Sequence, residues 1–254
     1  MYKLSNRFLD RYGVVSVVGC GGTGGFVAEG LCRLLVKDAR ILLIDYDRVE
    51  ESNLGRSNFT RADIGQFKSE VLAWRLSGQC NRPIAYSTLP VGAVPLPAGL
   101  VIGCVDNGPA RLQIERQLQH PVWWIDSGNG QNYGQILIGD TKGKDISRCF
   151  DDGICSDLPL PTVQRPELLA QEPGRRNCDE AVARNEQGPT INQAMATLVL
   201  EVVRRIIEGT CTWMQLYLDL DAGTLHPVNA TPEIVAKITG VKISHLIAKK
   251  GGDT

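Results

Sequence analysis

Three glycines near the start of the chain have the spacing of a phosphate-binding turn. Gly19, Gly21 and Gly24 form the pattern G-x-G-x-x-G directly after the β-branched run 14–18. Between a strand and a helix, such glycines let backbone N–H groups approach phosphates at the helix N-terminus. Asp45 ends the next apolar run, where a carboxylate accepts hydrogen bonds from a ribose. Alone, these residues favour an NAD-dependent oxidoreductase; a glycine-rich turn without a ligand is the other interpretation.

Polar and charged residues beyond Asp45 favour a triphosphate ligand over a dinucleotide. A dinucleotide has no evident use for two cations at this strand end. In ATP binding they neutralise phosphate charge, while amide and hydroxyl groups orient the phosphates. An alternative is that Arg56 and Lys68 are surface residues that only solvate a loop. The candidates are Asp47, Ser52, Asn53, Arg56 and Lys68.

Asp106 is the best-placed carboxylate for the magnesium ion that accompanies ATP. It follows the apolar run 100–105, which predicts a buried strand. The carboxyl ends of parallel strands meet at one edge of a sheet, so we expect Asp106 near the glycine turn. Mg²⁺ is commonly held by one or two carboxylates together with substrate phosphates.

The elements expected around these residues alternate between strand and helix. Continuous apolar runs predict buried strands, and apolar residues at helical spacing predict helices. This alternation predicts an α/β fold with a doubly wound, Rossmann-like sheet. We expect strands at 14–18, 41–45, 100–107, 123–126 and 134–139, with the glycine-rich 127–130 between the last two, helices at 26–35, 69–79 and 191–206, a hairpin at 213–228 and an amphipathic stretch at 233–250.

A long segment without clear periodicity interrupts this pattern. From 140 to 189 prolines recur at five positions, which predicts a partly mobile crossover loop. Loops longer than about 12 to 15 residues in a compact domain are usually functional or disordered. We therefore expect one domain over 1–254, with a nucleotide-binding part at 1–139, the crossover loop at 140–189 and a C-terminal helix, hairpin and tail at 190–254.

Composition excludes several classes of protein. With 254 residues, 43% of them hydrophobic, the chain can bury a sizeable core. A formal net charge of -1 argues against a protein that coats nucleic acid or binds membranes electrostatically. No segment approaches the roughly 20 apolar residues of a membrane span, and the N-terminus lacks the pattern of a secretory signal, so we expect a cytoplasmic protein.

The order of the motifs resembles that of one protein family. VVGCGGTGG, LIDYDRVEESNLGR, DIGQFK and CVDNGPAR follow one another along the chain. This order is similar to that of the ThiF/MoeB/HesA family, adenylyltransferases related to the ubiquitin-activating enzymes. The resemblance extends from residue 14 to about residue 228. Two further stretches, DSGNGQNYGQILIG and CDEAVARNEQG, look closest to stand-alone, plasmid- or operon-encoded ThiF-like proteins.

The resemblance implies a role for each matching residue. Gly22 would contact the nucleotide, and Asp45 would bind its ribose. Asp106 would hold Mg²⁺ beside Asn107. The phosphate contacts would come from Ser52, Asn53, Arg56 and Lys68.

The resemblance also implies a reaction and partners. Members of the family adenylate the carboxyl terminus of a small ubiquitin-like or sulfur-carrier protein and release pyrophosphate. A carboxylate is already a nucleophile, so the enzyme supplies positioning and charge stabilisation without a general base. We expect a homodimer in which Arg7 or Arg11 of a partner subunit completes the phosphate site. The alternative from another class is a silent, nucleotide-bound scaffold that docks a ubiquitin-like partner.

Cys178 precedes the expected helix at 191–206 in the position where several relatives carry a cysteine. A thiolate there would attack the acyl-adenylate to form a thioester or a persulfide-type adduct, and Arg175 and Arg176 would lower its pKa. The alternative is that Cys178 only packs under the helix. Cys149 and Cys155 are reserve candidates for the nucleophile.

Two features depart from the family pattern. Ser57 follows Arg56 where relatives often carry glutamine, which leaves the phosphate contacts intact. None of the eight cysteines forms the C-x-x-C pairs that bind structural zinc in many relatives. We therefore expect ATP and Mg²⁺ as ligands and no structural zinc.

Overall fold

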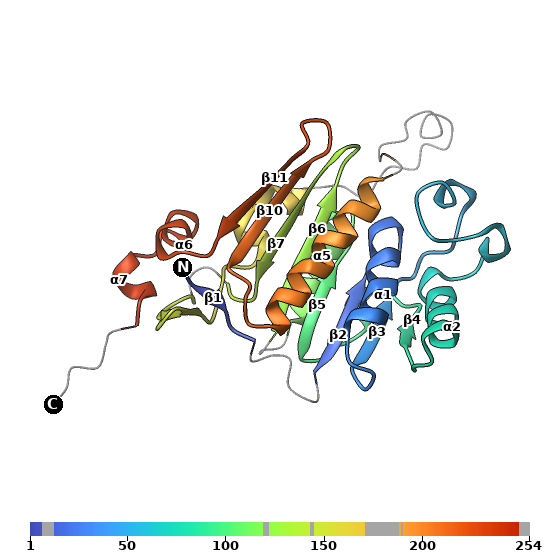
Figure 1. Ribbon diagram of the computed structural model, residues 1–254, viewed down its shortest axis with the longest axis horizontal. Coiled ribbons are helices and arrows are strands. Elements are labelled where there is room, and N and C mark those ends of the chain that lie inside the picture. Colours follow the sequence, from blue (N-terminus) through green and yellow to red (C-terminus); the bar gives the residue numbers. More distant parts are fainter. Residues whose placement is uncertain (7–12, 119–121, 143–144, 171–187, 189, 249–254) are drawn as a thin grey trace.

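An eight-stranded mixed sheet forms the centre of the molecule. The computed structural model describes residues 1–6, 13–118, 122–142, 145–170, 188 and 190–248. The sheet has the strand order β11-β10-β7-β6-β5-β2-β3-β4 (Figure 1). The strands are β2 Val14–Val18, β3 Arg40–Ile44, β4 Ala85–Ser87, β5 Gly99–Gly103, β6 Val122–Asn129, β7 Tyr133–Gly139, β10 Trp213–Asp219 and β11 Thr224–Asn229.

The sheet combines a parallel part with an antiparallel part. Strands β4, β3, β2, β5 and β6 pair in parallel, whereas β7, β10 and β11 continue the sheet with antiparallel pairing. Parallel strands are covered on both faces, and their sequences are accordingly almost continuous apolar runs. The expected doubly wound α/β fold with a C-terminal hairpin is confirmed.

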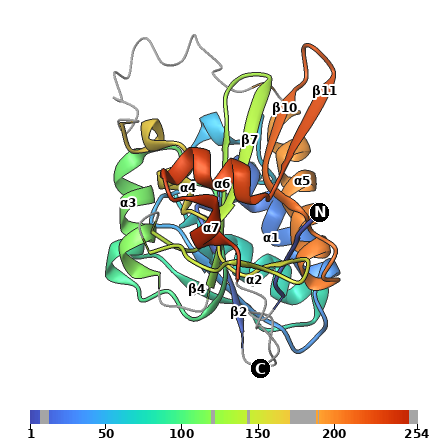
Figure 2. The same cartoon turned by 90° about the vertical axis from the view of Figure 1, so that its left-hand side faces the viewer.

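Helices cover both faces of the sheet. Figure 2 shows α3 and α4 on one side of the sheet and α1 and α5 on the other. The two cores are visible within one strand, because consecutive strand residues point to opposite faces. Trp123 is buried in the core beneath α1 and α5, and Trp124 in the core beneath α3. The helices are α1 Gly22–Leu34, α2 Lys68–Cys80, α3 Gly108–Gln117, α4 Pro161–Gln164, α5 Ile191–Ile207, α6 Pro232–Thr239 and α7 Ile243–Leu246.

Helix α1 begins in a turn that only glycine can form. Gly19 has a φ of +86°, in the left-handed region that glycine reaches without strain. A Cβ atom on Gly24 would lie 1.8 Å from the carbonyl oxygen of Gly19, so the first turn of α1 packs directly on the turn before it. Farther along α1, a Cβ atom on Gly30 would lie 2.1 Å from Leu200 of α5. Gly24 and Gly30 therefore allow α1 to pack closely on the glycine turn and on α5, respectively.

Arg82 stabilises the other end of α1. Its side chain is 4% exposed and donates hydrogen bonds to backbone carbonyls at and beyond the helix C-terminus, including 2.6 Å to Val36 and 2.8 Å to Ala39. The last carbonyls of a helix have no partner within the helix. A buried guanidinium satisfies several of them at once, which links α1 to the chain that follows α2.

The segment after β7 is more ordered than the sequence predicts. The described part of 140–170 contains two short strands, α4 and a 3-10 helix, Pro166–Ala170, within the expected crossover loop. The elements were missed because they are two to five residues long and their partners are distant in sequence. Strand β9 Ile154–Cys155 pairs with β1 Lys3–Leu4 and with β8 Phe150–Asp151 in a second, three-stranded sheet.

Two strand boundaries also differ from expectation. Ser127, Gly128 and Asn129 were expected to connect two strands, but they are the end of β6 and pair with β7. Strand β5, by contrast, ends earlier than expected, at Gly103 rather than at residue 107. Residues 104–107 therefore leave the sheet before α3 begins, which places Asp106 in a loop at the carboxyl edge.

Candidate functional site

A cavity of about 800 Å³ opens at the carboxyl ends of the parallel strands. Its walls come from the turn after β2, the loops after β3 and β5, the end of β6, the start of β7, the start of α5 and the hairpin β10–β11. Parallel α/β sheets bind ligands at this edge, where loops from adjacent strands converge. Among the predicted site residues that line it are Gly19, Gly21, Gly22, Asp45, Asp47, Asn53, Arg56, Lys68, Asp106 and Asn107.

Among the predicted site residues that the structure describes, two lie outside the cavity wall. Ser52 is exposed in the 3-10 helix Glu51–Asn53 and is not part of the lining. Gly24 is buried under the glycine turn, where its missing Cβ permits packing rather than ligand contact. Gly21, by contrast, has no atom within 4 Å of a Cβ built on it and faces open space in the cavity.

Asp45 holds the glycine turn in place. Its carboxylate accepts hydrogen bonds from the backbone N–H groups of Cys20, at 2.6 Å, and Asp47, at 2.8 Å. Burial raises the pKa of Asp45, while Lys68 and these two backbone donors act in the opposite direction. The carboxylate therefore links the turn after β2 to the loop after β3. Its contact with a ribose stays a prediction.

Arg56 and Lys68 bring positive charge to the same cavity. Lys68 begins α2, and its Nζ lies 3.2 Å from Oδ2 of Asp47. The lysine side chain is only 12% exposed, so its charge is partly shielded from water and acts strongly at short range. Arg56 lines the cavity in the loop after β3, where Asn53 also contributes to the wall. Arg56, Lys68 and the glycine turn thus line the same cavity.

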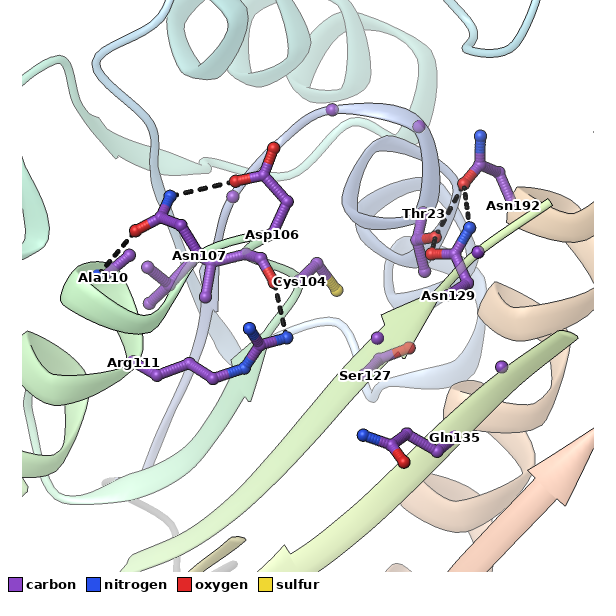
Figure 3. Close-up of a pocket in the computed structure, with 18 of the residues that line it drawn as sticks. Thr23, Cys104, Asp106, Asn107, Ala110, Arg111, Ser127, Asn129, Gln135 and Asn192 are labelled. Carbon is purple, nitrogen blue, oxygen red and sulfur yellow. Dashed lines mark hydrogen bonds between the residues drawn. The ribbon is translucent and has the colours of Figure 1, made fainter. Parts of the chain in front are cut away.

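Asp106 and Asn107 form another part of the wall, in the loop between β5 and α3. Asn107 caps α3 by accepting a hydrogen bond from the N–H of Ala110 at 2.9 Å. Its amide nitrogen donates to Oδ1 of Asp106, also at 2.9 Å (Figure 3). The Asp106 side chain is exposed to the cavity. A single oriented carboxylate of this kind suits Mg²⁺, which takes its remaining ligands from water and phosphates.

A buried ion pair supports this wall and was missed from the sequence. Nε of Arg111 lies 3.1 and 3.0 Å from the two carboxylate oxygens of Asp126, and the side chains are 1% and 0% exposed. Burial raises the pKa of Asp126, and the guanidinium opposes that effect. Arg111 also donates to the carbonyl of Val105 at 2.8 Å, immediately before Asp106 (Figure 3). Arg111 belongs to the motif CVDNGPAR and lies in α3, whereas its partner Asp126 lies on β6.

A second missed group is a polar cluster on the other side of the cavity. It consists of Thr23 in α1, Asn129 at the end of β6 and Asn192 in the first turn of α5 (Figure 3). All three residues line the cavity. No local pattern marks them, because the hydrogen bonds join positions separated by 63 to 169 residues.

The structure separates the candidate cysteines. Cys178 lies outside the described residues, as do Arg175 and Arg176. Cys149 and Cys155 are buried, and burial raises the pKa of Cys149 to about 12 and that of Cys155 well above its usual value. A thiol in such a site is scarcely ionised at neutral pH and is a poor nucleophile. The two reserve candidates are therefore poorly suited to the role.

Features outside the cavity add two further observations. Among the described residues, no group of three or more His, Cys, Asp or Glu side chains has the arrangement of a metal site. In the same part of the chain, no helix combines the length and apolar character needed to cross a bilayer. Arg7 and Arg11, the candidates for a partner's arginine, lie outside the described residues.

Fold and site together define an α/β protein of Rossmann-like topology in which a glycine turn, Arg56, Lys68 and Asp106 line one cavity. The chain belongs to the ThiF family, whose profile matches residues 9–251. The resemblance inferred from the sequence motifs is thereby confirmed.

Curated relatives include ubiquitin-like modifier-activating enzymes. Ubiquitin-like modifier-activating enzyme 5 of Drosophila grimshawi is 32% identical over 145 residues, which cover 50% of this chain and 35% of the relative. That of Oryza sativa subsp. japonica is 27% identical over 187 residues, 59% of this chain and 44% of the relative. The chain thus spans less than half the length of these relatives.

Solved structures show the same fold at low sequence identity. E. coli MccB with ATP superposes with a TM-score of 0.60 and 17% identity, covering 88% of this chain and 65% of that chain. MccB with AMPCPP and MccA superposes with a TM-score of 0.62 and 18% sequence identity, covering 88% of this chain and 65% of that chain. PaaA superposes with a TM-score of 0.60 and 16% sequence identity, covering 86% of this chain and 64% of that chain.

Proposed function

We propose that this chain uses ATP to adenylate the C-terminal carboxylate of a small ubiquitin-like or sulfur-carrier protein. The observation that carries the proposal is one cavity lined by the glycine turn, Arg56, Lys68 and Asp106. Family membership supports it, as do relatives named as modifier-activating enzymes and the MccB structures with ATP and with MccA. The two cations favour a triphosphate over NAD, whose two phosphates carry less charge.

The proposed reaction requires positioning more than acid–base chemistry. A carboxylate oxygen of the carrier attacks the α-phosphorus of ATP, the bond between that phosphorus and the β-phosphate oxygen breaks, and pyrophosphate leaves with the electron pair. Arg56 and Lys68 stabilise the charge that moves onto pyrophosphate, and the backbone N–H groups of the glycine turn orient the phosphates. No proton needs to be removed from the ionised nucleophile.

Asp106 fits a role as the protein ligand of Mg²⁺. Its carboxylate accepts a hydrogen bond from Asn107 and is exposed at the cavity that Arg56 and Lys68 also line. When bound, the ion would supply Lewis-acid stabilisation of the phosphate oxygens. The protein's part is to hold one carboxylate in place, through the cap of α3 and through the Val105 carbonyl fixed by Arg111.

Two finer proposals follow from the resemblance to the family. The first is that the acyl group then passes to Cys178, whose thiolate would attack the acyl carbon and release AMP. The burial of Cys149 and Cys155 supports Cys178 over these two. The second is that the protein acts as a cytoplasmic homodimer, in which Arg7 or Arg11 of the partner subunit would reach the phosphates.

Nucleotide binding and ATP–pyrophosphate exchange test the proposed function. We expect Mg·ATP to bind more tightly than NAD, and exchange to require a small protein ending in Gly-Gly, tested as a panel from neighbouring genes. Asp106→Ala should lower exchange at least 100-fold, a loss of about 2.7 kcal/mol of transition-state stabilisation. The matched control Asp38→Ala removes an exposed aspartate outside the cavity and should leave exchange unchanged.

Three outcomes separate the alternatives. Tighter binding of NAD than of ATP would reject adenylation in favour of an oxidoreductase. ATP binding without exchange for any carrier of the panel would favour a silent scaffold. For the second step, a reductant-sensitive adduct with the carrier should disappear in Cys178→Ser while adenylate still forms; an adduct that persists would reject Cys178 as the acceptor.

A further inference from the structure

The start of α5 is tied to the cavity by one buried side chain. Asn192 is 1% exposed and lies in the first turn of a 17-residue helix. Its carbonyl oxygen Oδ1 is 3.1 Å from the hydroxyl of Thr23 and 3.1 Å from the amide nitrogen of Asn129. The three side chains converge beside the cavity, each from a different element (Figure 3). Asn192 thus joins the first turn of α1 to the end of β6.

The other end of the same amide reaches the loop that carries Arg56. Nδ2 of Asn192 donates a hydrogen bond to the backbone carbonyl of Arg56 at 3.0 Å. The amide also packs on the glycine turn, because a Cβ atom on Gly22 would lie 2.3 Å from Nδ2. One planar group therefore contacts two of the segments expected to surround the phosphates and fixes the distance between them.

The burial of this amide makes its contacts selective. An amide group buried without hydrogen bonds costs about 1–3 kcal/mol, so Asn192 is stable only where both its oxygen and its nitrogen find partners. The oxygen is held by the body of the fold, through Thr23 and Asn129, whereas the nitrogen holds a loop. Asn192 can therefore transmit the position of the rigid elements to the loop of Arg56.

We propose that Asn192 is a positioning residue that sets the place of Arg56 for binding the ATP phosphates. The inference rests on the proposed function, since it assigns to Arg56 a phosphate contact. Asn192 acts through the backbone of Arg56 and does not itself touch the reacting atoms.

A double-mutant cycle separates this role from general support of the fold. The variants are Asn192→Ala, Arg56→Ala and the double variant, and the readout is the Kd of Mg·ATP by titration calorimetry. We expect Asn192→Ala to raise the Kd about 10-fold, a factor that corresponds to one hydrogen bond of about 1.4 kcal/mol. In the Arg56→Ala background the same change should raise it less than about 2-fold, because the group being positioned is gone.

Two further variants complete the test. Asn192→Ser keeps a polar group but is too short to reach the Arg56 carbonyl, and it should reproduce the effect if Asn192→Ala does not fold. Asn229→Ala removes an amide that accepts a hydrogen bond from Thr212 at 2.8 Å outside the cavity, and it should leave the Kd unchanged.

The outcomes keep the inference distinct from the proposed function. A full 10-fold effect that persists in the Arg56→Ala background would overturn the inference, and so would an unchanged Kd in folded Asn192→Ala. Both results leave adenylation intact, provided that the wild-type protein binds Mg·ATP and catalyses exchange. Failure of the wild-type protein in those two assays would instead reject the proposed function.

Discussion

Charged residues at the site are already engaged with the protein before any ligand arrives. Lys68 pairs with Asp47, and Asp45 is held by two backbone donors. Arg111 contacts Asp126 and donates a hydrogen bond to the Val105 carbonyl. Such prior contacts fix the directions of the side chains, and an oriented charge stabilises a ligand without the cost of reorganisation. Asp106 is the more exposed of these residues, with a carboxylate that accepts a hydrogen bond from Asn107 at 2.9 Å and lines the cavity.

Thiol reactivity tests the burial of the reserve cysteines. Because the pKa of Cys149 is raised to about 12, its thiolate fraction at pH 8 is negligible, and the thiol itself is enclosed. We expect iodoacetamide to leave Cys149 and Cys155 unmodified in the folded protein at pH 8 and to label both in urea. Peptide mass spectrometry measures this directly. Rapid labelling of either residue in the native protein would restore it as a candidate nucleophile.

The buried ion pair gives a prediction for stability. Arg111→Met leaves Asp126 as an uncompensated buried charge and should lower the free energy of unfolding by about 3–5 kcal/mol. Arg111→Met combined with Asp126→Leu should recover much of that loss, since neither charge remains. Urea unfolding at pH 7 measures both. A double variant as unstable as the single one would show that the pair supports packing rather than charge balance.

The pH dependence of the single variant follows from the same burial. Burial raises the folded-state pKa of Asp126 above its unfolded value, so the protonated form is favoured in the folded protein. The penalty for ionising Asp126 therefore shrinks as the pH falls toward about 4, the range of an unperturbed aspartate. Relative to wild type, the stability deficit of Arg111→Met should be smaller at pH 5 than at pH 7.

At the scale of elements, the glycine turn and α1 depend on positions with different tasks. Gly24→Ala would place a Cβ atom 1.8 Å from the Gly19 carbonyl and force the helix off the turn, which should cost about 3 kcal/mol. Gly21→Ala meets no atom within 4 Å and should change stability by less than about 0.5 kcal/mol. Its methyl group enters the cavity, so it should weaken Mg·ATP binding. Urea denaturation measures the stability of both variants, and calorimetry measures their binding of Mg·ATP. Equal losses of stability in Gly24→Ala and Gly21→Ala would contradict the packing role of Gly24.

The C-terminus of α1 depends on Arg82. Arg82→Met removes a buried donor from carbonyls including those of Val36 and Ala39, and it should destabilise the protein by about 3 kcal/mol. The stability of Arg82→Lys should lie between that of the wild type and that of Arg82→Met, since one ammonium group cannot reach all the carbonyls. As a control, Arg33→Met breaks an exposed pair with Glu29 and should cost less than about 1 kcal/mol. Urea denaturation compares them, and similar losses for Arg82→Met and Arg33→Met would rule out the capping role.

At the scale of the whole molecule, the cavity is closed by parts distant in sequence. The hairpin β10–β11 and the 3-10 helix Pro166–Ala170 contribute to its wall, beyond the region lined by the glycine turn. Arg165 of this wall lies 3.2 Å from the hydroxyl of Tyr217 in β10, which joins the two parts. The wall of the cavity therefore depends on contacts between segments far apart in the chain.

Subunit mixing tests the proposed homodimer. If an arginine of the partner subunit completes each site, the Arg7→Ala/Arg11→Ala variant and Asp106→Ala should each be inactive alone. Randomly mixed dimers would contain one intact site in half of the molecules, so about a quarter of wild-type exchange should return. Light scattering checks the dimer, and exchange with the carrier panel measures the recovery. Mixed dimers without recovery would place the phosphate arginine within the same subunit.

The sequence by itself determined the order of the main elements and the position of the glycine turn. Apolar runs and helical periodicity are local properties, and they placed β2, β3, α2, α5 and the hairpin within a few residues. The order of the motifs also indicated the family, because their spacing is preserved along the chain. Arg56, Lys68 and Asp106 were expected at one edge because the carboxyl ends of parallel strands coincide there.

Only the tertiary structure decided which side chains complete that edge. Asn192, Thr23 and Asn129 belong to different elements, and the Arg111–Asp126 pair bridges a helix and a strand. The short strands that join Lys3–Leu4 to Ile154–Cys155 likewise depend on a distant partner. These contacts arise from packing between segments far apart in the chain, whereas sequence periodicity records only whether a residue faces the core or the solvent.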